Sequence, residues 1–176
     1  GSSMMRSVRY SQDGASPITD VENITVELRN STAPYELVTS ATVMLKTNGT
    51  AVCSFPTASV GSYYIVVQSS NGITTWSANP QTLSNSALTY DFSTAANKAY
   101  GNNMKNLGSG VFGLYSGDIN QDESIDASDA TDLTNDIENS AFGVKMTDLN
   151  GDGSVDASDL PMYDYNQTLS VFCNRP

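Results

Sequence analysis

Side chains that carry oxygen recur at alternate positions in two short stretches near the end of this sequence. The first stretch, "DINQDESIDASD", runs from Asp118 to Asp129, and the second, "DLNGDGSVDASD", runs from Asp148 to Asp159. Eight of their twelve positions are identical and their starts lie 30 residues apart, so the sequence contains an internal duplication. Oxygen ligands at positions 1, 3, 5, 7, 9 and 12 of a twelve-residue loop are the arrangement that a calcium ion requires.

The predicted ligands are side-chain oxygens at five positions of each loop and the backbone carbonyl at position 7. They are Asp118, Asn120, Asp122, Ser124, Asp126 and Asp129 in loop one, and Asp148, Asn150, Asp152, Ser154, Asp156 and Asp159 in loop two. We therefore expect two Ca²⁺ ions per chain. Position 6 needs a positive φ, and it is Gly153 in loop two but Glu123 in loop one. Because a non-glycine residue there costs about 1 kcal/mol, site one is expected to be weaker or differently shaped.

The charge of the chain is concentrated around these loops. Of the net charge of −11, residues 1–117 contribute nothing, because six acids balance six bases there. Residues 118–176 hold thirteen acids against only Lys145 and Arg175. Such a block repels itself unless cations neutralise it. Nucleic acid is a poor partner for this chain, because the neutralisation of phosphates requires lysine and arginine.

A short helix is expected after each loop. Serine and aspartate at the end of each loop favour a helix N-terminus, and Pro161 suits a first turn, where its missing N–H group is not needed. Each helix has one apolar pair on one face, Leu133 with Ile137 in the first and Leu160 with Tyr163 in the second. The stretch before loop one, "GSGVFGLYSG", is a poor helix, so loop one is expected to lack an entering helix.

Position 8 of each loop is apolar, with Ile125 in loop one and Val155 in loop two. An apolar side chain at this position is expected to point away from the ion. The two loop backbones are expected to bond to each other here as a short ladder that couples the paired sites.

The first hundred or so residues indicate β-strands. Apolar and polar residues alternate in three stretches, which predicts strands with one buried face and one wet face. The apolar positions are Ile24, Val26 and Leu28; Ala41, Val43 and Leu45; and Leu88, Tyr90 and Phe92. The unbroken apolar run from Tyr64 to Val67 predicts a central strand, and Asn48-Gly49 and Asn71-Gly72 predict hairpin turns. This spacing indicates an antiparallel β-sandwich of about six or seven strands.

The predicted fold is mostly β with a small α module: an antiparallel β-sandwich followed by a duplicated EF-hand-type loop–helix module. The expected divisions are a lead-in at residues 1–15 with an expression scar, "GSSM", a β-sandwich at 16–115 and a double calcium-loop module at 116–176. No apolar run approaches the roughly 20 residues of a membrane-spanning helix, so no membrane insertion is expected. The given sequence shows no charged start followed by an apolar stretch, which is the pattern of a signal peptide.

Catalytic chemistry has little support in this sequence. The chain has no histidine, which removes Ser-His and Cys-His pairs and most zinc sites. The acids of the strand region are scattered, so no glycosidase-type carboxylate pair is visible and we expect no enzyme activity. Tyr63, Tyr64 and Trp76 are either core residues or a platform for a carbohydrate. Cys53, on the inward face of a predicted strand, and Cys173 are either free thiols or a disulfide.

A duplicated calcium loop, each copy followed by one helix, resembles the type I dockerin repeat over roughly residues 116–176. Dockerins are calcium-folded modules at the ends of secreted bacterial proteins, often polysaccharide-degrading enzymes, and they bind cohesin domains. The resemblance implies the twelve ligands named above and a secreted or cell-surface location in a bacterium. The stretches "YYIVVQSSNGITTWSANPQ" and "LTYDFSTAANKAYG" resemble, less specifically, a β-sandwich of the carboxypeptidase-regulatory or Ig-like type that precedes dockerin-like repeats.

In dockerins, cohesin contacts cluster at positions 10 and 11 of each loop and on the exit helices. The corresponding loop residues here are Ala127, Ser128, Ala157 and Ser158. The basic pair often found on the helices is replaced by Thr134-Asn135 and Asp164-Tyr165, which departs from the pattern for cohesin binding.

Three functions follow from these patterns. The leading one is a noncatalytic, calcium-stabilised C-terminal module that docks, anchors or spaces a secreted parent protein, with a cohesin-like domain as a candidate partner. The second is a purely structural terminus without a partner, which the lack of a long Gly/Ser linker favours. The third is a carbohydrate-binding β-sandwich that uses its aromatic residues.

Overall fold

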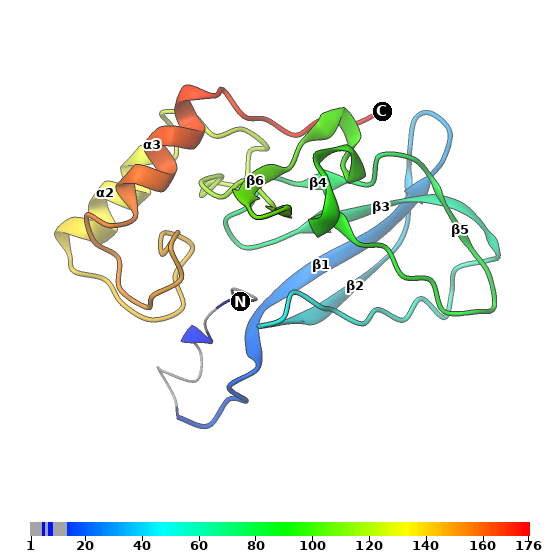
Figure 1. The fold of residues 1–176 in the computed structure, drawn as a ribbon, viewed down its shortest axis with the longest axis horizontal. Coiled ribbons are helices and arrows are strands. Elements are labelled where there is room, and N and C mark those ends of the chain that lie inside the picture. The colour runs from blue at the N-terminus through cyan, green and yellow to red at the C-terminus, as the bar shows by residue number, and fades with distance from the viewer. Residues whose placement is uncertain (1–4, 6, 9–13) are drawn as a thin grey trace.

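The computed structural model describes residues 5, 7, 8 and 14–176, and Figure 1 shows their arrangement. The expected expression scar and most of the expected lead-in therefore lie outside the described residues. The elements are β1 (Asp20–Asn30), β2 (Leu37–Lys46), β3 (Gly61–Gln68), β4 (Thr75–Trp76), β5 (Gln81–Leu83), the 3₁₀ helices η1 (Phe92–Thr94), η2 (Ala96–Lys98) and η3 (Tyr100–Asn102), β6 (Lys105–Gly108), β7 (Val111–Gly113), α2 (Ala130–Glu138) and α3 (Leu160–Thr168).

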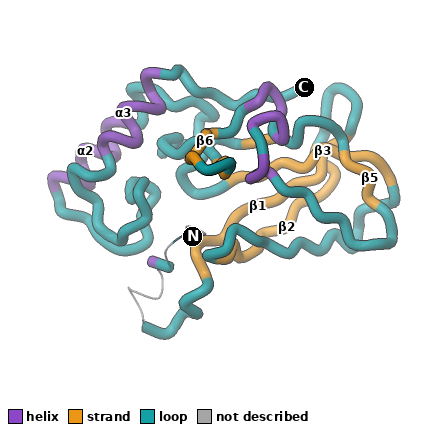
Figure 2. Tube along the Cα trace, viewed as in Figure 1, coloured by secondary structure: helices purple, strands orange, loops and turns teal. Residues whose placement is uncertain are grey.

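One five-stranded antiparallel sheet forms the centre of the strand region. Its order is β2-β1-β3-β4, and β5 also pairs with β3, while β6 and β7 form a separate two-stranded sheet. The helices α2 and α3 lie at one end of the molecule and β5 at the other (Figure 1; the strands are orange in Figure 2). The expectation of a mostly β, antiparallel fold with a small helical module is confirmed.

Strand β1 is buried on one face and, at Glu27, on the other face as well. Ile24, Val26 and Leu28 are buried, as the alternation predicts. The alternation also predicted that the opposite face is exposed to solvent. This prediction is wrong for Glu27, which is buried as well. Its Oε2 accepts a hydrogen bond from Arg29 Nε at 2.6 Å, so the carboxylate is paired rather than solvated. Strand β1 lies between two neighbours in the sheet, and charge pairing explains why a glutamate is tolerated there.

Two predicted strands are missing. The expected strand from Leu88 to Phe92 is a loop that leads into η1, where the Asp91 carboxylate accepts a hydrogen bond from Ser93 N–H at 2.8 Å. This acidic cap favours a helical turn over a strand. Residues 51–60 also form no strand, so only the turn of the Asn48-Gly49 hairpin exists, with Gly49 at φ +81°. Pro56 lacks the N–H group that a ladder would need.

The Asn71-Gly72 corner joins β3 to β4, which pair antiparallel through Val66↔Trp76 and Val67↔Thr75. The predicted pairing is confirmed. The corner does not use a positive φ, however, and Gly72 pairs with Ser116 just before loop one. Asn71 O accepts a hydrogen bond from Gly117 N–H at 2.7 Å. The corner therefore attaches the strand region to the first calcium loop.

The aromatic residues of the strand region are packed against one another. Trp76 is 4% exposed and Tyr64 is 8% exposed, and their ring centroids lie 5.7 Å apart in an edge-to-face arrangement. Tyr35 and Tyr100 complete the cluster around them. Tyr63 is half-buried and donates its hydroxyl hydrogen to Ser59 O at 3.1 Å. Tyr64 and Trp76 are core residues and form no platform for a carbohydrate.

A single apolar cluster extends from the sheet into the loop–helix repeats. We call residues 14–115 the β region and residues 116–176 the repeat module. The cluster contains Tyr64, Val66, Ile73 and Trp76 from the β region, and Ile119, Ile125, Leu133, Leu149, Val155, Tyr163, Val171 and Cys173 from the repeat module. The predicted apolar pairs of both helices pack in or against it, and Pro161 lies in the first turn of α3, as predicted. The two parts therefore share one core.

Both cysteines are free thiols, Cys53 in a loop and half-buried, and Cys173 buried against the β region. The strand position predicted for Cys53 is wrong, because residues 51–60 form no strand. Burial raises the pKa of Cys173 to about 11, and the negative charge of Glu123 acts in the same direction. Burial also raises the pKa of Cys53.

We predict two separate phases in the reaction of the native protein with a disulfide-exchange reagent at pH 8. A thiol of pKa about 11 is ionised in only about one molecule in a thousand at that pH, and the thiolate is the reactive species. Cys173 should therefore react slowly and Cys53 first. Cys53→Ser should remove the fast phase and leave the slow one. Two fast phases would contradict the burial of Cys173, and the absence of any titratable thiol would indicate a disulfide.

Candidate metal centre

The two loops adopt the same backbone conformation. In each loop φ is positive at positions 4 and 6, at Gln121 (59°) and Glu123 (72°) in loop one and at Gly151 (69°) and Gly153 (93°) in loop two. Position 6 was predicted. Position 4 was missed, although the glycine that loop two carries there was a usable signal. Loop one thus holds two non-glycine residues in a left-handed conformation, each at a cost of about 1 kcal/mol.

The carboxylates at position 12 are buried and close their loops. Asp129 Oδ1 accepts hydrogen bonds from the N–H groups of Ile119 and Asn120 at 2.7 and 3.0 Å, and its Oδ2 accepts one from Asp126 N–H at 3.0 Å. Asp159 accepts the three equivalent bonds in loop two. Neither carboxylate caps its exit helix, so that part of the capping prediction is wrong. The side chains instead turn back into the loops.

The carboxylates at position 1 are also buried. Asp148 accepts hydrogen bonds from the N–H groups of Gly151, Asp152 and Gly153 at 2.8 to 3.1 Å. Its pKa is raised, mainly by burial, although these N–H groups lower it. The pKa of Asp118 is raised to about 6, first by burial and then by the charges of Asp129 and Asp122. Both loops thus hold a carboxylate whose charge is poorly solvated.

The side chains at positions 3, 5 and 9 of loop one are exposed, and all three are tied to Ser128 at position 11. In loop one, Asn120 Nδ2 donates to Asp122 Oδ2 at 2.9 Å and to Ser128 Oγ at 2.7 Å. Ser128 donates backbone and side-chain hydrogen bonds to Asp126, which lower the pKa of that carboxyl. Ser158 does the same for Asp156 in loop two. These exposed carboxylates are therefore held in the charged form.

The twelve predicted ligands are brought together in two loops, six in each. Within the described residues, however, no group of three or more His, Cys, Asp or Glu side chains has the arrangement of a formed metal site. Several of the loop carboxylates are directed to backbone N–H groups instead.

Unpartnered buried oxygens test whether the loops fit a cation. Asp118 Oδ1 and Asn150 Oδ1 are buried and have no hydrogen-bond partner. A buried acceptor without a partner is costly, and a cation removes that cost. The atoms that the proposed ligands would offer to a metal are all oxygens, and the chain has no histidine. This donor set fits a hard cation such as Ca²⁺ and fits poorly with zinc.

Each loop pairs with the segment that follows the helix of the other repeat. In loop one, Ser124 faces Phe172, with Ile125 N–H donating to Val171 O and Cys173 N–H to Glu123 O, both at 2.8 Å. The predicted ladder between the two loops is therefore wrong. In a pair of this kind the two facing residues direct their own C=O and N–H groups away from each other. The Ser124 carbonyl is thus left outside the ladder, as a position 7 ligand requires.

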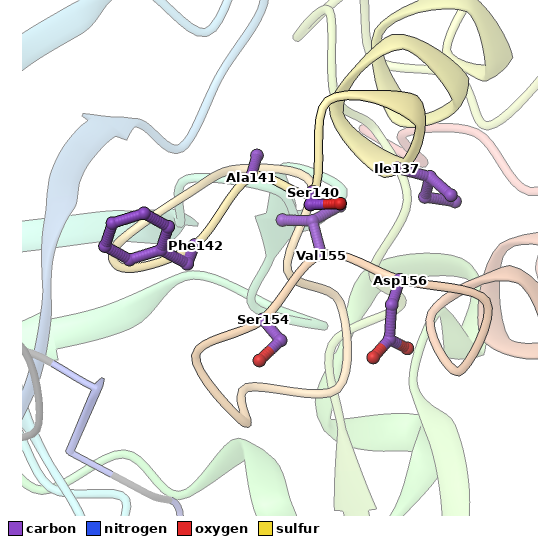
Figure 3. A pocket seen from close by; sticks show the side chains of 7 residues that line it. All are labelled: Ile137, Ser140, Ala141, Phe142, Ser154, Val155 and Asp156. Carbon is purple, nitrogen blue, oxygen red and sulfur yellow. The ribbon is translucent and has the colours of Figure 1, made fainter.

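The second ladder is the copy of the first, shifted by thirty residues. Ser154 of loop two faces Phe142, and Phe142 and Phe172 are 73% and 57% exposed. Figure 3 shows Val155 beside Ser140 and Ala141, while Ser154 and Asp156 extend to the other side of the chain. The repeat module therefore has an approximate twofold symmetry. The apolar side chain at position 8 points away from the loop acids, as predicted.

Comparison with known proteins finds one family match, and it lies within the repeat module. Residues 116–164 match the dockerin type I domain. No curated protein matches the chain. Two solved structures resemble it: an N-terminal and a C-terminal interface mutant of a type II cohesin–X–dockerin complex from Acetivibrio cellulolyticus. Their identities are 17% and 18%, with TM-scores of 0.42 and 0.43 over 86% and 82% of this chain and 81% and 80% of those chains. In the part of the chain that the structure describes, no helix is long and apolar enough to cross a membrane.

We predict that the two loops bind two Ca²⁺ ions in a calorimetric titration, loop two more tightly. Gln121→Gly with Glu123→Gly should strengthen the weaker site by up to about thirtyfold, because two strains of about 1 kcal/mol each are removed. Ala127→Gly, on the exposed surface of the same loop, is the control and should have little effect. Equal affinities in the unmodified protein, or no effect of the double substitution, would contradict the role of backbone strain.

Proposed function

We propose that the chain is a noncatalytic docking module of a secreted bacterial protein, in which calcium orders the dockerin repeats for a cohesin-like partner. The observation that carries the proposal is a pair of like loops, each with an oxygen-only ligand set and a buried oxygen that lacks a partner. The ions would be held by Asp118, Asn120, Asp122, Ser124, Asp126 and Asp129 in loop one and by Asp148, Asn150, Asp152, Ser154, Asp156 and Asp159 in loop two. A bound ion supplies the positive charge that these carboxylates lack.

The partner surface we propose consists of loop positions 10 and 11 with the exit helices. Ala127, Ser128, Ala157 and Ser158 are all exposed. The hydroxyl groups of Ser128 and Ser158 each accept a hydrogen bond of 2.7 Å from the asparagine at position 3 of the same loop. An ion that orders the loop would therefore order these serines too. Neither α2 nor α3 contains lysine or arginine, so the partner would supply the basic groups.

A purely structural terminus is the second candidate, and the contacts between the repeat module and the β region favour it. Lys105 Nζ of β6 donates to Asn166 Oδ1 of α3 at 2.5 Å and lies 4.6 Å from the centre of the Tyr165 ring. Asn166 Nδ2 in turn donates to Ser116 O at 2.7 Å. Burial lowers the pKa of Lys105. These contacts hold α3 in place whether or not a partner binds.

We predict calcium-dependent binding to at least one member of a panel of purified cohesin domains, measured by calorimetry in calcium and in chelator. Ala127→Arg with Ala157→Arg should weaken that binding at least about tenfold. The two large, charged side chains would lie at the centre of the proposed interface, where added bulk and charge are poorly tolerated. The calcium stoichiometry should stay at two. Val52→Arg, on an exposed loop of the β region, is the matched control and should bind normally.

The outcomes separate the candidates. Two bound ions and a calcium-dependent melting temperature without any cohesin binding would favour the structural terminus. A stoichiometry of zero would remove both candidates, because each depends on calcium in the loops.

A further inference from the structure

We propose that the two loops, although built alike, act on different parts of the molecule. The ion of loop one holds residues 171–174, which we call the C-terminal strap, against the β region and keeps Trp76 buried. The ion of loop two holds the connection between the repeats. This inference rests on the proposal that both loops bind calcium.

Loop one is bonded directly to the C-terminal strap. Ile125 N–H donates to Val171 O and Cys173 N–H donates to Glu123 O, both at 2.8 Å. Between these two bonds lies Ser124, whose carbonyl is the ligand proposed at position 7. An ion that fixes the Ser124 carbonyl would therefore also fix the two backbone bonds on either side of it.

The other side of the strap lies on the β region. Asn103 Nδ2 donates to Phe172 O at 3.0 Å, which is the carbonyl that the ladder directs away from loop one. Cys173 belongs to the same buried cluster as Trp76. A Cβ atom added to Gly101 would lie 2.9 Å from the Asn174 side chain, so the strap packs closely against η3. The strap is thus a single layer between loop one and the core of the β region.

The ladder of loop two has no such bond to the described residues 14–115, although a Cβ atom added to Gly153 would lie 3.5 Å from Val8. Its ladder partners are Ala141 and Gly143, with Val155 N–H donating to Ala141 O and Gly143 N–H to Gly153 O, both at 2.8 Å. Within the described part of the chain, no hydrogen bond joins residues 141–143 to residues 14–115. Asn71 Nδ2 does reach Asp148 O, but only at 3.4 Å, and it bonds the first residue of the loop rather than its ladder. The two ladders are therefore alike in their bonds but differ in their neighbours, because only the strap of loop one is bonded to residues 14–115 among the described residues.

The first test compares two pairs of exposed carboxylates that occupy the same positions in the two loops. Asp122→Ala/Asp126→Ala disables loop one and Asp152→Ala/Asp156→Ala disables loop two, each in a Cys53→Ser background. In saturating calcium, the loop-one variant should label Cys173 at least about tenfold faster than the parent, because the strap is released from its buried position. Its fluorescence should shift to longer wavelength, because Trp76 is the only tryptophan of the chain. The loop-two variant should stay within about twofold of the parent in both measurements.

The results of this comparison separate the inference about the strap from the proposal that the loops bind calcium. Equal acceleration by both variants, or none by the loop-one variant once calorimetry shows that it binds one ion, would overturn the inference and leave the calcium proposal intact. A parent protein that binds no calcium would overturn both.

A second test approaches the strap from the β region and leaves every loop residue in place. Asn103→Ala removes the hydrogen bond to Phe172 O, and coupling between two sites is reciprocal. It should therefore weaken one of the two calcium affinities about threefold or more and leave the other unchanged. Asn97→Ala, at an exposed position of η2, is the control and should change neither affinity. An equal loss at both sites, or no loss at either, would overturn the inference even if the loop-one variant failed to fold.

Discussion

Buried carboxylates without a basic partner among the described residues are the constraint on which this structure depends. Asp118 and Asp129 in loop one and Asp148 and Asp159 in loop two are buried. The only bases after residue 117 are Lys145 and Arg175, and they pair with Asp136 and Glu123, which are not among the proposed ligands. Two like charges 4 Å apart repel by about 1 kcal/mol in water and about 4 kcal/mol near a protein surface. Among the described residues, the loops therefore bring these carboxylates together without a lysine or arginine side chain to offset their repulsion.

The apolar core explains how such loops are held in position. Each exit helix buries little more than one side chain, Leu133 in α2 and Tyr163 with Asn166 in α3. Two helices of nine residues are too short to be stable without tertiary contacts. They gain these contacts from a cluster that continues through Val171 and Cys173 to Trp76 and Tyr64. The β region thus supplies packing that the repeats lack, which argues against a flexible connection at residue 116.

Local features of the fold followed from the sequence, and contacts between distant segments did not. The loop positions, the exit helices and the strand from Tyr64 to Val67 depend on spacing within about twelve residues, which a sequence displays directly. The burial of Glu27 depends on its pairing with Arg29 and on neighbouring strands at both edges of β1. The ladders from Ser124 to Phe172 and from Ser154 to Phe142 join segments with no periodic signal in common. Nothing in the order of residues could have shown which segment each loop would meet.

The duplication preserved the loops more strictly than their surroundings, and this difference determines what the symmetry can do. Within the loops the same hydrogen bonds recur at position 12 and the same positive φ values at positions 4 and 6. Outside them, the segment after α2 leads to the second loop, whereas the segment after α3 lies on the β region. Two ions bound in similar loops would therefore stabilise different contacts. The twofold relation is a property of the ligand loops, and the contacts of the C-terminal strap with the β region are not repeated after α2 in the described residues.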